Sequence, residues 1–358
     1  MARIIYAVAG EGFGHASRAH LIGQRFLDAG HEVMFVSSHR ALLYLRQYYG
    51  RRVKEIFGLT FAYRQGKVDP VATFFKNAVH LPQANRQNKK LFDQVYAPFR
   101  PDLVVTDFEP FTGWWAWRHG VPFISISNEH ILTACKLEHG LWDTIPRLTA
   151  TVVTHFYYIG AEAYVVINFF RAPVKKRSAV LAPPVVRPVV TTLEPSDAGH
   201  VVVYSTTGMH ENRLCTVLHD FEDQTFYVYG FNRFAEVKNC VFKERSTEGF
   251  LADVAASRGV IASAGFSLMS ECLYLKKKML LLPLAGQYEQ IVNARYAERL
   301  GLAVMSRRLD RAAVARFLQR LDEPMPQDDR ILWPDNEAFF QTLEDVLSRL
   351  DRPVSIAL

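Results

Sequence analysis

One segment of the sequence has the residue types and spacing of a phosphate-binding turn. Residues 263–267 read Ser-Ala-Gly-Phe-Ser, between a short apolar run at residues 260–262 and a predicted helix over residues 267–275. Gly265 lets a ligand approach the backbone, and the N–H groups that begin the helix favour phosphate. Glu271 lies one turn into that helix, where its carboxylate can accept both hydroxyl groups of a ribose. The alternative is a plain strand–turn–helix unit with a serine cap.

Polar side chains follow the next predicted strand, over residues 279–283, and begin a polar-faced helix over residues 287–300. They are Gln287, Glu289, Gln290 and Asn293. The carboxyl ends of strands form the ligand-binding edge of an open α/β sheet, so this cluster is a second candidate for ligand binding.

A glycine-rich turn near the N-terminus presents a candidate general base. Residues 10–15, Gly-Glu-Gly-Phe-Gly-His, follow an apolar run at residues 3–9 and precede a predicted helix over residues 16–29. The glycines are Gly10, Gly12 and Gly14. They form a backbone that can pass beneath a bulky substrate, with Glu11 and His15 at its rim. Because the start of a helix disfavours a protonated ring, we expect a lowered pKa for His15 and a neutral imidazole that accepts a proton. A simple helix cap is the alternative.

The same strand–turn–helix pattern occurs in dinucleotide-binding proteins, but two details oppose NAD(P). The spacing is GxGxG rather than GxGxxG, and the next strand, over residues 31–37, leads into Ser-His-Arg without an acid for the ribose. Arg18, one turn beyond His15, suits either a phosphate contact or a solvent-facing position.

Acidic groups and a histidine follow two buried strands predicted at residues 101–107 and 121–127. They are Asp107, Glu109, Glu129 and His130. In a parallel sheet these groups converge on the edge that carries His15. Asp107 then orients a base or positions an acceptor hydroxyl, unless the acids serve as helix caps.

Hydroxyl side chains also lie at the end of another predicted strand. The strand predicted at residues 200–205 runs into Ser205, Thr206, Thr207 and Gly208, which together suit a phosphate. Phe250 lies at the start of a helix over residues 246–256, where its ring stacks on a nucleotide base or packs in the core.

The chain of 358 residues is long enough for two domains, and its 49% hydrophobic and 22% charged residues are typical of a soluble globular protein. Prolines between residues 171 and 200 indicate a linker, with the boundary near residues 175–184. We expect domains at residues 1–175 and 185–335, then a closing helix within residues 336–358. No apolar run reaches 18 residues, and we expect no signal peptide. Four cysteines without CxxC spacing favour reduced thiols in the cytoplasm over zinc or disulfides.

The net charge of +6 and the pI near 9.1 suit an anionic membrane face or a phosphorylated substrate. Nucleic acid is not expected, since the basic residues are dispersed and carry no binding signature. Residues 39–90 are rich in aromatic and basic side chains, which indicates either a surface for anionic lipid or an ordinary core face beside solvated charges.

Residues 10–15, 205–208, 263–271 and 287–293 together resemble the motifs of GT-B glycosyltransferases. The chain looks most like family 28, the branch of the peptidoglycan lipid II N-acetylglucosaminyltransferase. The resemblance implies an α/β protein of two Rossmann-like, doubly wound parallel-sheet domains that face a cleft. It places the acceptor in the first domain, the donor in the second, and the final helix back on the first.

The resemblance also assigns roles to residues. The diphosphate would be held by Ser205, Thr206, Thr207, Gly208, Ser263, Gly265, Phe266 and Ser267. Phe250 would contact the nucleotide base and Glu271 the ribose. The donor sugar would contact Gln287, Glu289 and Gln290. Catalysis would use His15, Asp107 and Glu11, with Gly10, Gly12 and Gly14 in the acceptor loop. No metal or cofactor is implied, because helix termini neutralise the leaving diphosphate.

We therefore expect a metal-independent, inverting glycosyltransferase that uses a UDP-linked sugar. Two alternatives stay open. One is a hydrolase of the same donor, because residues 14–18 also resemble nucleotide-sugar hydrolases of this fold, in which the histidine activates water. The other is a non-catalytic donor-binding subunit. The acceptor is either lipid-linked, with the protein at the inner face of the membrane, or a small cytoplasmic molecule. The family commonly has His or Arg where Ser263 stands, so the sugar is left open.

Overall fold

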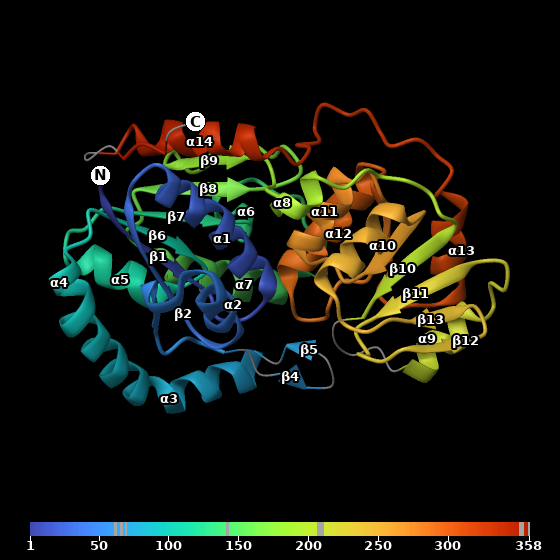
Figure 1. Ribbon diagram of the computed structural model, residues 1–358, viewed down its shortest axis with the longest axis horizontal. Coiled ribbons are helices and arrows are strands. Elements are labelled where there is room, and N and C mark those ends of the chain that lie inside the picture. The colour runs from blue at the N-terminus through green and yellow to red at the C-terminus, as the bar shows by residue number, and fades with distance from the viewer. Residues whose placement is uncertain are drawn as a thin grey trace. The chain divides into compact units, whose positions relative to one another are not determined.

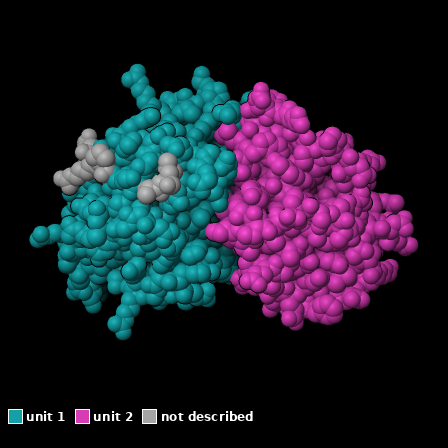
Figure 2. Space-filling view, turned by 45° about the horizontal axis from the view of Figure 1, so that its top comes forward, with its two compact units in different colours: residues 1–62, 69–185, 335–358 teal, residues 63–68, 186–334 magenta. Residues whose placement is uncertain are grey.

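The computed structural model describes residues 1–60, 63–64, 67–68, 70–140, 143–205, 211–350 and 354–356. Within these ranges, side chains are described for residues 1–60 and from residue 79 onward. The chain divides into two compact units (Figure 2). Unit 1 comprises Met1–Ala62, Asp69–Val185 and Asp335–Leu358, and unit 2 comprises Tyr63–Val68 and Val186–Pro334.

Unit 1 is built on a parallel sheet of seven described strands, in the order β3-β2-β1-β6-β7-β8-β9 (Figure 1). The strands are β1 (Arg3–Val8), β2 (Glu32–Ser37), β3 (Val53–Glu55), β6 (Leu103–Asp107), β7 (Phe123–Ser127), β8 (Ala163–Ile167) and β9 (Ala179–Ala182). The central strands are buried along almost their whole length, as expected where helices cover both faces of a sheet.

The helices of unit 1 connect these strands and cover the sheet. They are α1 (Phe13–Asp28), α2 (His39–Tyr49), η1 (Gly50–Arg52), α3 (Pro70–Leu91), η2 (Phe92–Tyr96), α4 (Ala97–Phe99), α5 (Pro110–Arg118), α6 (Ile131–Ala134), α7 (Thr144–Tyr157) and α14 (Asn336–Leu347). Although α14 comes late in the chain, it packs on β8 and β9 (Figure 1). Its buried residues, Phe339, Phe340, Leu343, Val346 and Leu347, have the spacing of a one-sided helix.

Unit 2 contains a second sheet of seven described strands, in the order β12-β13-β11-β10-β14-β15-β16. The strands are β10 (His200–Tyr204), β11 (Thr225–Tyr229), β12 (Ala235–Val237), β13 (Cys240–Phe242), β14 (Gly259–Ala262), β15 (Lys278–Leu281) and β16 (Ala303–Met305). Only β12 is antiparallel among them. The helices are α8 (Pro188–Thr191), α9 (Glu211–Leu218), α10 (Thr247–Ala256), α11 (Phe266–Tyr274), α12 (Tyr288–Arg299) and α13 (Arg311–Gln319). A small antiparallel pair, β4 (Tyr63–Arg64) and β5 (Lys67–Val68), also belongs to this unit.

Each large sheet has a point where the strand order reverses direction. In unit 1, β1 lies between β2 and β6, and in unit 2, β10 lies between β11 and β14. In open α/β sheets, the connections that follow two adjacent strands leave toward opposite faces at such a point, and ligands bind in the crevice between them. The adjacent strands here are β1 and β6 in unit 1, and β10 and β14 in unit 2. Two doubly wound α/β units confirm the predicted fold class.

Two local predictions are corrected. Residues 179–182 form β9, so the strand predicted at residues 162–169 is not the last of its sheet. The division between the two units follows β9, after Val185. Helix α1 begins at Phe13 rather than residue 16, which places Gly14 and His15 in its first turn.

Within the described residues, no helix combines the length and the hydrophobicity that crossing a bilayer requires.

Candidate active site

A histidine, an aspartate and an arginine meet where the strand order of the first sheet reverses. Asp107 ends β6, whose neighbour β1 leads through the glycine turn into α1. Nδ1 of His15 lies 2.8 Å from Oδ1 of Asp107. Arg18, one helical turn after His15 and on the same face of α1, donates from Nε to Oδ2 at 2.8 Å and from Nη2 to Oδ1 at 2.7 Å. Asp107 is fully buried and Arg18 is 6% exposed.

The loop after β7 adds a second carboxylate to this group. Oε1 of Glu129 lies 3.7 Å from Nε2 of His15, and its other oxygen accepts a hydrogen bond from Ser127. The ring of Phe108 stacks on His15 with centroids 5.9 Å apart. Phe108 has a positive φ of 57°, a strained conformation for a bulky residue that is frequent at functional sites.

The charges around His15 raise its pKa. Burial alone would lower the pKa of the ring, but the hydrogen-bonded carboxylate of Asp107, together with Glu129, outweighs burial and raises it above the ordinary 6.5. The predicted lowering by the helix start is therefore wrong, because a full charge at 2.8 Å acts more strongly than a partial helix charge. For Asp107, burial alone would raise the pKa, but Arg18 and His15 lower it to about 2.

This arrangement suits general base catalysis. An ionised Asp107 only accepts hydrogen bonds, so Nδ1 of His15 carries the proton and Nε2 keeps a lone pair. The His15 side chain is 19% exposed, enough to meet a hydroxyl group. After Nε2 takes a proton, Asp107 and Glu129 stabilise the imidazolium.

The three glycines of the glycine-rich turn, residues 10–15, occupy different structural environments. A Cβ on Gly10 would lie 2.1 Å from Oγ and 2.9 Å from the carbonyl oxygen of Ser38, so only glycine fits there. Gly12 has a φ of 95° and precedes α1, whereas Gly14 lies inside the helix. Glu11 is half-buried in the turn between β1 and α1.

Two groups that were expected at this edge have structural roles instead. Glu109 caps α5, where its carboxylate accepts from the N–H groups of Phe111 and Thr112. His130 is fully buried, and its Nε2 lies 2.8 Å from Oγ of Ser125. Burial, with Lys176 nearby, lowers the pKa of His130 to about 3. The predicted convergence therefore holds for Asp107 and Glu129 only.

In unit 2, β10 and β14 are neighbouring strands at the point where the order reverses. Ser205 is buried at the end of β10, and its neighbours Thr206, Thr207 and Gly208 lie outside the described residues. Gly265 precedes α11, whose N-terminus has no side-chain cap among the described residues. Ser263 and Ser267 are half-buried around this N-terminus, and Phe266 is buried. An uncapped helix N-terminus can bind an anion.

Glu271 has a partner that the sequence did not indicate. Arg187 donates from Nε to Oε1 at 2.6 Å and from Nη2 to Oε2 at 2.9 Å. Glu271 is 5% exposed. Arg187 immediately precedes α8 in the proline-rich segment, where no sequence signal connects it to α11. A carboxylate has about four acceptor positions, so Glu271 can still accept from a ribose.

The polar cluster on α12 joins the loops after β14 and β15. Oε1 of Gln290 accepts from the N–H of Leu284 at 3.0 Å, and its amide donates to Gln287. Asn293 donates to the carbonyl oxygen of Ala264 at 3.2 Å and to Glu289. The cluster therefore fixes the geometry of the ligand-binding edge.

The ring of Phe250 lies at the carboxyl ends of β10 and β11. Its centroid is 5.1 Å from that of Tyr204 and 5.0 Å from that of Tyr229, each the last residue of its strand. Phe250 is half-buried, so part of its ring is accessible at the edge that carries Ser205.

Comparisons with known proteins cover most of the chain. The sequence profile of glycosyl transferase family 1 matches residues 2–322. No curated protein matches the sequence. The solved calicheamicin glycosyltransferase CalG4 has a TM-score of 0.62 and 15% identity, over 98% of this chain and 99% of CalG4. UGT2 of Phytolacca americana, solved with UDP-2fluoro-glucose and pterostilbene, has a TM-score of 0.63 and 13% identity, over 90% of each chain. The glycotransferase of kitacinnamycin has a TM-score of 0.60 and 17% identity, over 89% of this chain and 93% of that one. At such identities the likeness concerns the fold.

Proposed function

This chain belongs to glycosyl transferase family 1, and from that premise we propose that it transfers a sugar from a UDP-linked donor to an acceptor hydroxyl group, with inversion and without a metal. Glycosyltransferase activity and the GT-B fold are as predicted. The finer resemblance to family 28 stays a prediction. The observation that carries the proposal is the partly exposed ring of His15, whose Nδ1 is hydrogen-bonded to the buried Asp107.

The proposed reaction is one displacement at the anomeric carbon. Nε2 of His15 takes the proton of the acceptor hydroxyl, and the oxygen forms the new glycosidic bond. The bond between the sugar and the diphosphate breaks, and the nucleoside diphosphate leaves with both electrons. Asp107 stabilises the imidazolium, and Glu129 positions the hydroxyl group beside Nε2.

We assign the donor to unit 2. The uncapped N-terminus of α11 would bind the diphosphate together with Ser205 and Ser267, and its positive end would supply the stabilisation that a metal gives elsewhere. Phe250 would stack on the base, and Glu271 would accept from the ribose while Arg187 holds its orientation. Gln287, Glu289 and Gln290 would contact the sugar or shape its pocket.

For the acceptor, we favour a small apolar molecule with a hydroxyl group that binds in unit 1. UGT2 was solved with pterostilbene, a molecule of this kind. A lipid-linked acceptor is the second candidate, with the protein at the inner face of the membrane. It is supported by Leu43 and Tyr48, which are 63% and 55% exposed on α2 beside the exposed Arg46. Flotation with anionic vesicles separates the two, since only the second predicts salt-sensitive binding.

Substitution of His15 by alanine tests the proposal. We expect kcat to fall by about 10²- to 10⁴-fold while the Kd for UDP stays within twofold, because the lost group is a base and not a donor contact. UDP release and sugar transfer are measured in parallel, with and without a panel of phenols and alcohols. Full activity of the variant would contradict the assignment. UDP release from donor alone at the full rate would identify a hydrolase instead.

A further inference from the structure

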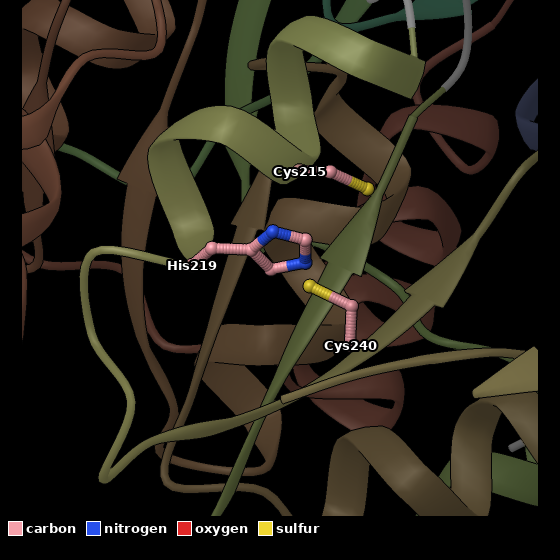
Figure 3. Close-up of side chains that lie close together, drawn as sticks. All are labelled: Cys215, His219 and Cys240. Carbon is pink, nitrogen blue, oxygen red and sulfur yellow. The ribbon is translucent and has the colours of Figure 1, made fainter. Parts of the chain in front are cut away.

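Two thiols and an imidazole come together in unit 2, away from the residues discussed above. Cys215 lies on α9, His219 directly follows that helix, and Cys240 is the first residue of β13. The three side chains point toward one another (Figure 3). One ligand atom of each, the two sulfur atoms and a ring nitrogen, lie within 4.8 Å of one another.

The fold holds these residues in place before any ligand arrives. The N–H of His219 donates to the carbonyl oxygen of Cys215 at 2.9 Å, so the helical turn continues and both side chains share one face. The side-chain nitrogen Nδ2 of Asn239 donates to the carbonyl oxygen of Leu218 at 3.0 Å and to that of Phe221 at 2.8 Å. These bonds fix the end of α9 against the start of β13.

The position of the cluster excludes a part in sugar transfer. Cys240 begins β13 and pairs with Phe226 near the start of β11. The cluster is therefore at the amino ends of the strands, whereas the loops after β10 and β14 are at the carboxyl ends. Cys240 belongs to the hydrophobic core of unit 2 and is fully buried.

We propose that Cys215, His219 and Cys240 bind a zinc ion that fixes α9 to β13. Two sulfur atoms and one imidazole nitrogen are a preferred ligand set for zinc. Tetrahedral zinc with bonds of about 2.3 Å to sulfur and 2.0 Å to nitrogen separates its ligand atoms by roughly 3.5–3.8 Å. That spacing fits within the 4.8 Å that the cluster spans. A water molecule would complete the tetrahedral coordination.

Charge balance also suits a divalent cation, because binding of zinc displaces both thiol protons and the two thiolates then neutralise the ion. Affinity should therefore increase with pH. Nε2 of His219 lies 3.3 Å from the carbonyl oxygen of Val237, a long contact that lets the ring adjust to a metal.

The cysteine spacing predicted no zinc site, and the present proposal departs from that prediction. The ligands come from a helix end and a strand that are brought together by the order β13-β11-β10. Such a site has no contiguous CxxC signature.

Titration with cobalt tests the assignment, because cobalt replaces zinc and its bonds to thiolates absorb in the near ultraviolet. The chain is reduced, stripped of metal with a chelator, and titrated with Co²⁺ and then Zn²⁺. We expect one equivalent of cobalt per chain, displaced by one equivalent of zinc. His219→Ala and Cys215→Ser should each weaken binding by at least tenfold, while Cys135→Ser, at a buried thiol of unit 1, should leave it unchanged.

His219 is only partly buried, so its alanine variant should fold, as circular dichroism can verify. Absence of the absorption band in the reduced wild-type chain would overturn the proposal. So would a band of full strength in both His219→Ala and Cys215→Ser. UDP binding is measured on the same samples, because failure of the zinc site leaves the proposed transferase unaffected.

Discussion

At the scale of single residues, the charge around His15 determines the pH dependence of the proposed reaction. A base must be neutral, and the pKa of His15 is raised by Asp107 and Glu129. The acid limb of the kcat/KM profile should therefore have a midpoint above 6.5. Glu129→Gln should move that midpoint to lower pH and reduce the plateau, because one carboxylate near the ring is lost. A midpoint unchanged by the substitution would mean that another group titrates.

The same pKa shifts affect stability in the opposite sense. Since the folded-state pKa of His15 is raised, its contribution to stability is complete below about 6.5 and is lost as pH rises through the folded pKa. Since the pKa of Asp107 is lowered to about 2, its contribution is complete above the ordinary value of 3.8 and is lost as pH falls toward 2. Between these limits both groups stabilise unit 1, while activity requires a more alkaline pH.

Arg18 is the residue whose loss should most destabilise this site. Arg18→Met leaves the fully buried carboxylate of Asp107 with only His15 as a partner, which should cost about 3–5 kcal/mol of unfolding free energy. Arg46→Met is the matched control, because its pair with Glu55 is exposed and should contribute less than about 1 kcal/mol. Urea denaturation measures both. Arg18→Met combined with Asp107→Asn should recover part of the loss, since no buried charge is then left unpaired, and equal losses in the two single arginine variants would contradict this account.

At the scale of secondary structure elements, a glycine in the loop after β11 holds the end of β10. A Cβ on Gly230 would lie 1.9 Å from the carbonyl oxygen of Ser205, and its φ is 111°. The clash involves backbone atoms, so no side chain can move to relieve it. Gly230→Ala should therefore displace Ser205 and weaken UDP binding by at least tenfold.

Gly199→Ala provides the control for that prediction. Gly199 also has a positive φ, 83°, but no atom lies within 4 Å of the position of an added Cβ. Its substitution should cost only the strain of that conformation, roughly 1–3 kcal/mol, and should leave UDP affinity unchanged. Calorimetric titration and urea denaturation of both variants separate strain from the clash. Equal UDP affinities would show that Ser205 does not contribute to donor binding.

The elements that the sequence predicted and those it missed differ in their place in the sheets. The strands β1, β6, β10 and β14 are buried apolar runs of strand length, and the sequence placed each of them within a residue or two. Among the strands of the two large sheets, it missed β3, β9, β12 and β16, which are the edge strands. These edge strands have only three or four residues and are partly exposed, so each is too short for its residue pattern to identify a strand.

The site shows the same division. His15 and Asp107 were predicted because Asp107 ends a clearly apolar strand and His15 follows the glycine turn after another. The pairing of Arg18 with Asp107, and of Arg187 with Glu271, was not predicted, because each pair joins segments far apart in the sequence. The type of a residue indicated chemistry, but its partner depended on which strands are neighbours.

At the scale of the whole molecule, two independent sheets repeat one topological device. Each has its order reversed beside a central strand, and each places a turn rich in small residues there. Both α1 and α11 begin without a side-chain cap, but α1 carries a histidine that is hydrogen-bonded to Asp107, whereas α11 carries Glu271, which is held by Arg187. We therefore infer a division of labour, with chemistry on the acceptor in unit 1 and donor recognition in unit 2.

Hydrogen exchange can test this division on the intact chain. UDP alone should slow exchange at residues 263–271 and 284–293, because bound ligand favours the closed state of the groups that it contacts. Residues 10–15 should be unaffected by UDP and should respond only when an acceptor is added. NAD is the matched control, since the glycine turn lacks the spacing and the acid that a dinucleotide needs. Protection at residues 10–15 by UDP alone would place the donor in unit 1 and reverse the assignment, whereas protection by NAD there would show that the turn binds a dinucleotide after all.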